Sequence, residues 1–178
     1  MKVYSRLAAF VTLLCAFPSQ AIDICSYTNR NCRSTTFGCC SNVPLGTCCF
    51  WQYDFLGWSV QFRNVTGNWI GNTYTDTSCG VQAGTTGASE GATGACISVP
   101  TTSTVNWFSG RYVLNSTVVA PGAKTGEKAE CRTPDVLGFS HSGREYHVDV
   151  PEGQFENIAQ LLHAGEYEAL REIAREAV

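Results

Sequence analysis

The stretch CSYTNRNCRSTTFGCCSNVPLGTCC, residues 25–49, carries six cysteines, four of them in two adjacent pairs. Three more follow it outside the N-terminal leader, so the nine cysteines are Cys25, Cys32, Cys39, Cys40, Cys48, Cys49, Cys79, Cys96 and Cys131. In an exported chain, clustered cysteines indicate disulfides before metal ligands. We expect at least two disulfides inside this stretch. Nine cysteines leave at least one outside the disulfides, and the sequence does not fix the pairing.

Adjacent cysteines are poor partners for each other, because their Cα atoms lie about 3.8 Å apart across a trans peptide, below the usual disulfide range. Cys39 and Cys40 should therefore bond in different directions, and so should Cys48 and Cys49. The stretch is therefore predicted to be a cross-linked knot and not a simple loop.

Residues 1–21 have the pattern of a signal peptide: Lys2 and Arg6 precede the apolar run LAAFVTLLCAF, and Ser19 and Ala21 are the small residues before the cleavage point. The run is too short for a membrane span, which needs about 20 apolar residues, and no second run follows. The protein is thus predicted to be secreted and extracellular, with no membrane span in the mature chain.

The chain has a formal net charge of −3, and its C-terminal 28 residues hold six acidic and two basic side chains. No stripe of basic residues is present to attract a phosphate backbone, so a nucleic-acid partner is not expected.

Residues 58–63 alternate apolar and polar, which predicts a strand, and residues 69–75 are predicted to pair with it as a hairpin. Gly80 to Ala95 contains five glycines and is predicted to be a mobile loop. Further strands are expected at 96–99, 105–114, 117–120 and 145–150.

After Pro151 the apolar spacing becomes helical: Phe155, Ile158 and Leu162 predict one helix that ends at Gly165, and Leu170 and Ile173 predict a second.

The predicted fold class is α+β, a disulfide-rich, mainly antiparallel β domain followed by two short C-terminal helices. The predicted domains are a signal peptide (1–21), a disulfide-rich β domain (22–150) and a C-terminal amphipathic helical pair (151–178). The helices should dock through their apolar stripes, with a partner-binding tail as the alternative.

Catalytic patterns are sparse. The stretch GFSHSG at 138–143 does not fit the nucleophile elbow G-x-S-x-G. Glu145, His147 and Asp149 would share one face of a strand near His141, where a general base or metal ligands could form, but a solvated polar face explains them more simply. We assign no catalytic residue, no metal ligand and no cofactor.

Aromatic side chains are the better candidates for binding. Trp51, Tyr53, Trp58 and Trp69 could stack on a sugar or anchor a partner protein, and Trp51 and Tyr53 are the first choice because they directly follow the cysteine stretch. Two sequons, at Asn64 and Asn115, make these asparagines candidate glycosylation sites.

Several segments carry a resemblance to known proteins. The stretches CCSNVPLGTCCFW and GWSVQFRNV, the Ser-Cys-Gly at 78–80 and the VPEG at 150–153 together resemble uncharacterised small secreted cysteine-rich proteins of fungi. Cys39-Cys40-Ser41 with a later Cys48 is similar to hevein-type modules, which implies chitin binding. GWSVQF and WFSGRYVL resemble strands of βγ-crystallin-like secreted toxins and inhibitors.

The sequence favours binding over catalysis, although it leaves enzyme activity open. The first hypothesis is a secreted non-catalytic binding protein of effector, toxin or inhibitor type that acts on an extracellular protein partner. The alternatives are a module that binds cell-wall polysaccharide, chitin or glucan, and a small secreted hydrolase.

Overall fold

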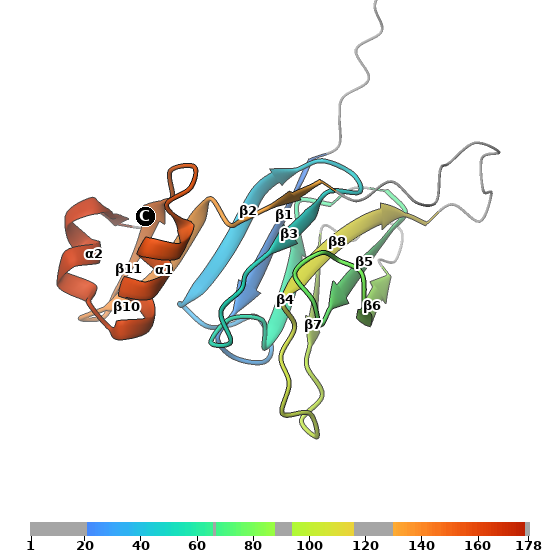
Figure 1. The fold of residues 1–178 in the computed structure, drawn as a ribbon, viewed down its shortest axis with the longest axis horizontal. Coiled ribbons are helices and arrows are strands. Elements are labelled where there is room, and N and C mark those ends of the chain that lie inside the picture. Colours follow the sequence, from blue (N-terminus) through green and yellow to red (C-terminus); the bar gives the residue numbers. More distant parts are fainter. Residues whose placement is uncertain (1–20, 66, 88–93, 116–129, 177–178) are drawn as a thin grey trace, which may run out of the picture.

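The strands form two sheets that pack face to face (Figure 1). The computed structural model describes residues 21–65, 67–87, 94–115 and 130–176. The predicted signal peptide, apart from Ala21, and the strand predicted at 117–120 lie outside these residues. The fold is mainly antiparallel β with two short C-terminal helices and four disulfides, which confirms the predicted α+β class.

The first sheet has seven strands in the order β12-β11-β10-β2-β1-β4-β7. Its members are β1 (Ile22–Tyr27), β2 (Phe37–Val43), β4 (Ser59–Arg63), β7 (Gly94–Ser98), β10 (Val136–His141), β11 (Arg144–Asp149) and β12 (Arg175–Glu176). All of its pairings are antiparallel.

The second sheet has five strands in the order β6-β5-β8-β3-β9. They are β3 (Cys48–Phe50), β5 (Trp69–Tyr74), β6 (Gln82–Gly87), β8 (Ser109–Leu114) and β9 (Cys131–Arg132). Only the β3–β9 pairing is parallel among the strands that the structure describes.

Two glycines bring the sheets close together. A Cβ atom on Gly71 of β5 would lie 2.5 Å from the Phe62 ring on β4, and one on Gly110 of β8 would lie 3.1 Å from Ile24 on β1. Phe62 and Ile24 therefore pack directly on the bare backbone of the opposite sheet, and both are fully buried. The main core lies between the sheets at these contacts.

Two sequence predictions for this region are wrong. The strands at 59–63 and 69–74 do not form a hairpin, because β4 belongs to the seven-stranded sheet and β5 to the five-stranded sheet. The glycine-rich segment 80–95 is not a loop throughout, since β6 and β7 occupy both its ends. Glycine has a weak propensity for strands, but pairing with β5 and β4 holds β6 and β7 as edge strands.

The disulfides follow from the alternation of side chains along β2. Cys39 and Cys40 are neighbours on a strand, so they point to opposite faces of the sheet. Cys39 bonds Cys25 on β1, whereas Cys40 bonds Cys49 of the other sheet.

Two disulfides thus lie inside residues 25–49, as predicted. The other two tie this stretch to later parts of the chain: Cys48 to Cys79, and Cys32 to Cys96 on β7. Cys131 is exposed on β9.

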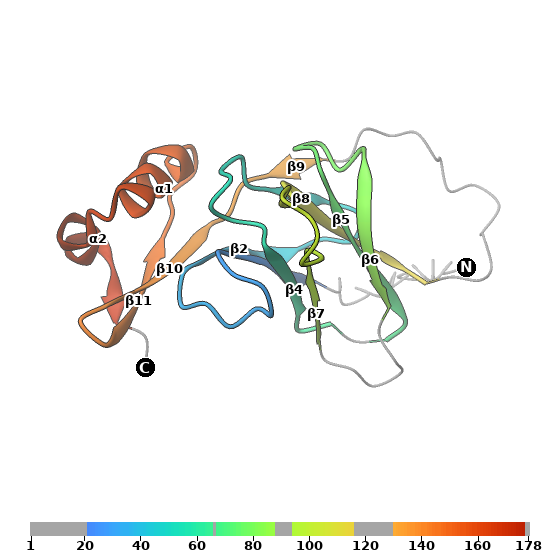
Figure 2. The same ribbon diagram turned by 90° about the horizontal axis from the view of Figure 1, so that it is seen from below.

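The two helices cover one face of the β10–β11 hairpin at one end of the molecule (Figures 1 and 2). Helix α1 (Phe155–Ala164) ends at Gly165, whose φ of 75° is the left-handed conformation that the prediction required, and α2 (Tyr167–Ile173) follows directly. Both predicted helices are confirmed. Phe155, Ile158, Leu162 and Leu170 are buried, but the expectation that Ile173 docks is wrong, because 55% of it is exposed. Ile173 is the last residue of α2, and Leu170 is the residue of this helix that is buried.

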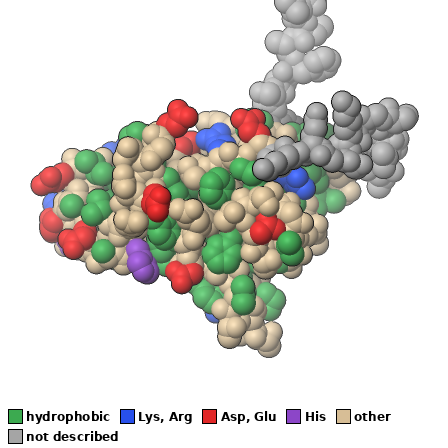
Figure 3. All heavy atoms as spheres, in the orientation of Figure 1, with side chains coloured by type: hydrophobic (Ala, Val, Ile, Leu, Met, Phe, Trp, Pro, Cys, Tyr) green, Lys and Arg blue, Asp and Glu red, His purple; other side chains and the backbone are tan. Residues whose placement is uncertain are grey.

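Acidic side chains gather over the helical end of the molecule (Figure 3). Three of them are paired with basic groups: Glu168 contacts Arg171 and His141, Glu176 contacts Arg144, and Asp149 contacts Arg175. Exposed pairs of this kind contribute little stability, so the helices are held mainly by apolar packing. Neither helix among the described residues is long and apolar enough to cross a membrane.

Asp76 closes the loop that carries Cys79. Its carboxylate accepts backbone N–H groups from Ser78, Gly80 and Val81, and these bonds, that of Gly80 first, lower its pKa from 3.8 to about 2. A carboxyl group with a lowered folded-state pKa adds stability above its unfolded pKa, and that stability is lost as the pH falls toward 2.

We expect Asp76→Asn to reduce stability at neutral pH and to flatten the loss of stability between about pH 4 and pH 2. The amide keeps one oxygen acceptor but places an N–H₂ group where Oδ2 now accepts from Gly80 and Val81. Urea unfolding across this pH range measures the effect. Asp54→Asn is the control, because the described residues give the exposed Asp54 side chain no hydrogen bond. Identical pH profiles for Asp76→Asn and the wild type would contradict the prediction.

Candidate functional site

A small pocket lies on the outer face of the seven-stranded sheet, opposite the main core. Alternate residues of β1, β2 and β4 point outward here, while their neighbours in sequence point inward. The outward cysteines form the Cys25–Cys39 disulfide, and a separate small apolar cluster surrounds it. The pocket has a volume of about 300 Å³, and its wall includes Tyr27, Arg33, Phe37, Arg63, Glu145 and His147. We call it the Arg63 pocket.

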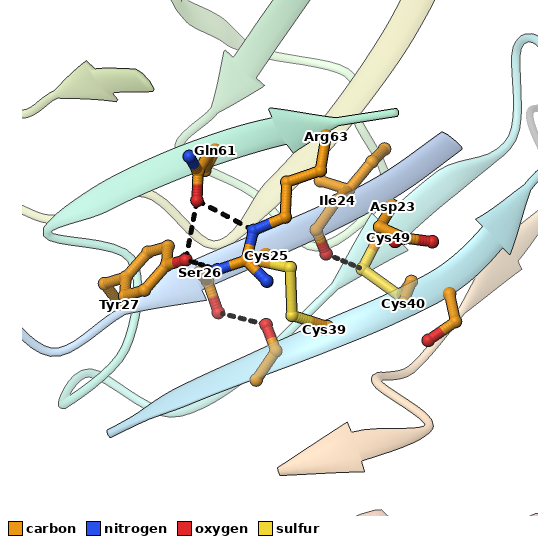
Figure 4. The surroundings of a disulfide bond; sticks show 12 residues. Asp23, Ile24, Cys25, Ser26, Tyr27, Cys39, Cys40, Cys49, Gln61 and Arg63 are labelled. Atoms are coloured by element: carbon orange, nitrogen blue, oxygen red, sulfur yellow. Dashed lines mark hydrogen bonds between the residues drawn. A yellow bond between two sulfur atoms is a disulfide. The ribbon is translucent and has the colours of Figure 1, made fainter. Parts of the chain in front are cut away.

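Arg63 is held in place by its neighbours on β1 and β4 (Figure 4). Its Nε donates to Gln61 Oε1 at 2.8 Å, and its Nη2 donates to the Tyr27 hydroxyl. The Tyr27 hydroxyl in turn donates to the same Gln61 oxygen at 2.7 Å. Three side chains thus form a closed triangle, which fixes the orientation of the guanidinium group.

Aromatic rings form the apolar side of the pocket. The Arg63 guanidinium carbon lies 5.7 Å from the ring centres of both Tyr27 and Phe37, within the range of a cation–π contact. Burial raises the pKa of Tyr27, and the nearby Arg63 only partly opposes this, so the hydroxyl stays protonated and can donate to Gln61. The two rings therefore cover a flat face of the guanidinium group.

Gly138 lets the pocket extend onto the C-terminal hairpin. It lies opposite Phe37 in the β10–β2 ladder, and a Cβ atom there would lie 2.2 Å from the Phe37 ring. The bare backbone gives the ring room to reach β11, where it meets His147 edge-on at 5.4 Å between ring centres. A side chain at position 138 would force the ring away and separate the two parts of the pocket.

Burial lowers the pKa of His147 below its ordinary 6.5, and the positive charges of Arg175 and Arg63 lower it further against the opposing effect of Glu145 and Asp149. His147 is therefore neutral at pH 7 and adds no charge to the pocket there. Glu145 and exposed Arg33 lie at the rim.

The four aromatic residues predicted to bind do not form a common surface. Trp51 and Trp69 are completely buried between the sheets, and Trp51 donates its indole N–H to the Trp107 carbonyl at 2.7 Å. Trp51, a first choice for stacking on a ligand, therefore exposes no ring face in this structure, and neither does Trp69. Trp51 packs beside Gly110 of β8, and Trp69 packs against the Phe62 ring at 5.6 Å between ring centres.

Trp58 and Tyr53 are half-buried. Arg30 covers the Trp58 ring at 4.7 Å from its centre, and Arg30 is itself held by the carbonyls of Val99 and Ser103. Tyr53 packs against the α1 residue Phe155 and donates its hydroxyl to the Glu156 carbonyl. Tyr53 therefore joins the helices to the β body.

The polar face predicted on β11 exists, since Glu145, His147 and Asp149 alternate with the buried Tyr146 and Val148. His141 lies apart from them and contacts Glu168 at 3.1 Å. Within the described residues no three His, Cys, Asp or Glu side chains lie close enough to hold a metal ion. Glu145 and His147 instead line the Arg63 pocket.

Both sequon asparagines belong to the described residues, but Thr66, Ser116 and Thr117 do not. Asn64 is exposed and donates its amide to Asp23 at 2.7 Å, and the backbone N–H of Asn115 donates to the Asn68 carbonyl. Glycosylation of both asparagines stays a prediction.

The strand alternation at 58–63 already indicated that Gln61 and Arg63 would face away from the core, but it could not show what they would meet. The partners come from β1, β2 and β11, at positions up to 84 residues away in the sequence. The one local indication of the Arg63 pocket was an arginine two residues after a glutamine on the polar face of a predicted strand.

The family ARB_05566_N, described as an N-terminal domain, matches residues 23–135. The match spans more than half of the chain, and the protein belongs to this family. No curated protein and no solved structure matches the chain. The matched residues contain β2 to β9 and all of β1 except Ile22. The Arg63 pocket therefore combines Tyr27, Phe37 and Arg63 of the family domain with Glu145 and His147 of the hairpin that follows it.

Proposed function

We propose that this protein is secreted and acts by binding an extracellular protein partner, without catalysis, through the Arg63 pocket. It would then be a binding protein of effector, toxin or inhibitor type. The observation that carries the proposal is an arginine held over the adjoining rings of Tyr27 and Phe37 in an open pocket. Arginine and tyrosine are enriched among the residues that dominate binding energy in protein interfaces.

Two features support an extracellular setting. Four disulfides link the strands and loops of the β domain, and such bonds persist in oxidising compartments. Residues 1–21 also have the order of charged, apolar and small residues that directs export. Secretion can be checked by the N-terminal sequence of protein recovered from the medium, which we expect to begin at Ile22.

Rigidity supports binding at this pocket over a purely structural role for Arg63. A side chain that is already ordered loses little entropy when a partner arrives, so its contacts add more to affinity. Arg63 is ordered by Gln61 on β4 and by Tyr27 on β1, and the Cys25–Cys39 disulfide ties β1 to β2. A polysaccharide partner has less support, because Trp51 and Trp69 are buried and Arg30 covers Trp58.

The test is saturable binding of extracellular proteins to the immobilised full-length secreted protein. We expect the wild type to retain a protein partner and Arg63→Gln to bind it at least tenfold more weakly. Arg144→Gln is the matched control, because Arg144 is exposed and contacts only Glu176 among the described residues. Equal loss in both variants, or saturable retention on chitin or glucan with no protein partner, would overturn the proposal.

A further inference from the structure

The Arg63 guanidinium keeps an unused edge. Arginine has five N–H donors in a planar fork, and the Nε and Nη2 edge already serves Gln61 and the Tyr27 hydroxyl. Two N–H groups on Nη1 and one on Nη2 make no hydrogen bond with the described residues. One N–H from each of these nitrogens points in parallel from the end of the group. This is the geometry that binds both oxygens of one carboxylate.

The carboxylate opposite Arg63 in the sheet is already engaged elsewhere. Asp23 lies opposite Arg63 in the β1–β4 ladder, but its oxygens accept the backbone N–H of Asn42 at 2.9 Å and the Asn64 amide at 2.7 Å. Elsewhere in the described chain, Arg132, Arg144, Arg171 and Arg175 each contact a carboxylate. Arg63 has no such contact there, although it is half-buried and its charge is partly removed from water.

From this geometry we infer that the Arg63 pocket binds a carboxylate on an acidic segment of a polypeptide, with the unused edge of Arg63 as the donor. The inference rests on the proposed function, because it names the chemistry by which the partner is recognised. The Phe37 ring would contact the apolar stem of the acidic side chain. The rim carries exposed Arg33 and Glu145, so the pocket lining has two positive side chains, Arg63 and Arg33, against one negative side chain. A volume of about 300 Å³ suits one side chain and its neighbours.

Gln61 and Tyr27 act as positioning residues in this account. They hold one edge of the guanidinium group and leave the other edge without a hydrogen bond among the described residues, and they need not touch the ligand. Gln61→Ala should keep the charge of Arg63 but release its orientation. We therefore expect Gln61→Ala to weaken binding less than Arg63→Gln does. Arg63→Lys should also weaken binding, because an ammonium group cannot present two parallel N–H donors.

The experiment titrates the full-length secreted protein with the acetylated, amidated peptide Gly-Glu-Glu-Gly and with its Gly-Gln-Gln-Gly counterpart, followed by NMR. With the acidic peptide we expect saturable shifts of the His147 and Tyr27 ring signals, and a rise in the pKa of His147 as a negative charge is added beside Arg63. The neutral peptide should cause neither change. Arg63→Gln should lose at least tenfold in affinity, and Arg144→Gln should bind as the wild type does. The dispersion of the remaining signals shows whether each variant is folded.

Absence of saturable shifts, or binding that does not depend on Arg63, would overturn the inference. So would binding of an oligogalacturonate that depends on Arg63 with no binding of the acidic peptide, since the carboxylate source would then be a sugar acid. If the peptide binds but no protein partner is found, the carboxylate site stands and the proposed function fails. If a protein partner binds through Arg63 while the acidic peptide does not, the function stands and the ligand chemistry is wrong.

Discussion

Replacing Trp51 with alanine is expected to lower the free energy of unfolding by about 3–5 kcal/mol, the usual cost of removing a large aromatic side chain from a core. Trp51 is completely buried between the two sheets. Its loss would open a cavity beside Gly110 and leave the Trp107 carbonyl without the indole N–H that now donates to it. Urea unfolding of the oxidised protein measures the change.

Tyr53→Phe is the matched control for this substitution. It removes only the hydroxyl bond to the Glu156 carbonyl and keeps the ring packed against Phe55 and Phe155. We expect a cost of about 0.5–1.5 kcal/mol, as for a single hydrogen bond. If Trp51→Ala were as mild as Tyr53→Phe, Trp51 would not be a core residue, and the packing of the two sheets described above would be wrong.

Deleting residues 152–178 is expected to cause aggregation and to lower the melting temperature. Phe155, Ile158, Leu162 and Leu170 are buried against the β10–β11 hairpin and the β body, at about 1.5–3 kcal/mol each before the entropy of ordering is subtracted. The deletion would expose hairpin residues such as Phe139, which stacks on Tyr167. Light scattering after size exclusion gives the association state.

Two point variants separate this packing from a general effect of truncation. Leu170→Ala should cost about 2–5 kcal/mol, because the side chain is only 1% exposed. Ile173→Ala should change stability by no more than about 0.5 kcal/mol, since more than half of Ile173 is exposed. A truncated protein that stays monomeric with an unchanged melting temperature would show that the helices are an independent appendage.

The sequence was most informative where short-range periodicity decides the structure. The helical spacing after Pro151 and the glycine at position 165 predicted α1, α2 and their junction, and the alternation at 58–63 predicted β4. The crowding of cysteines predicted disulfides inside residues 25–49. These features depend on neighbours within a few positions, so the sequence alone contains most of what determines them.

Features set by distant partners could not be predicted in the same way. Nothing near residues 59–74 shows that β4 and β5 belong to different sheets, because β1 and β8 decide their pairing. The burial of Trp51 depends on Gly110 and Trp107, which lie more than fifty residues away. The Arg63 pocket likewise forms only when β1, β2, β4 and β11 come together, so its residues did not stand out as a motif.

The orientation of Arg63 connects the fold to the proposed function. The pairing of β1 with β4 places Tyr27 beside Gln61 and Arg63, and the glycine at position 138 opens the way to His147. A lysine at position 63 would keep the positive charge but lose the fork. A substitution that keeps the positive charge at position 63 but removes the fork geometry is therefore the sharpest test of the proposed function.

The most direct test compares the affinity of the wild type and of Arg63→Lys for the protein partner retained by the immobilised wild type, measured by titration at one salt concentration. The account predicts at least a tenfold weaker affinity for Arg63→Lys and an unchanged affinity for Arg144→Lys. Equal affinities for the wild type and Arg63→Lys would contradict it, because the fixed arginine fork would then have no part in recognition.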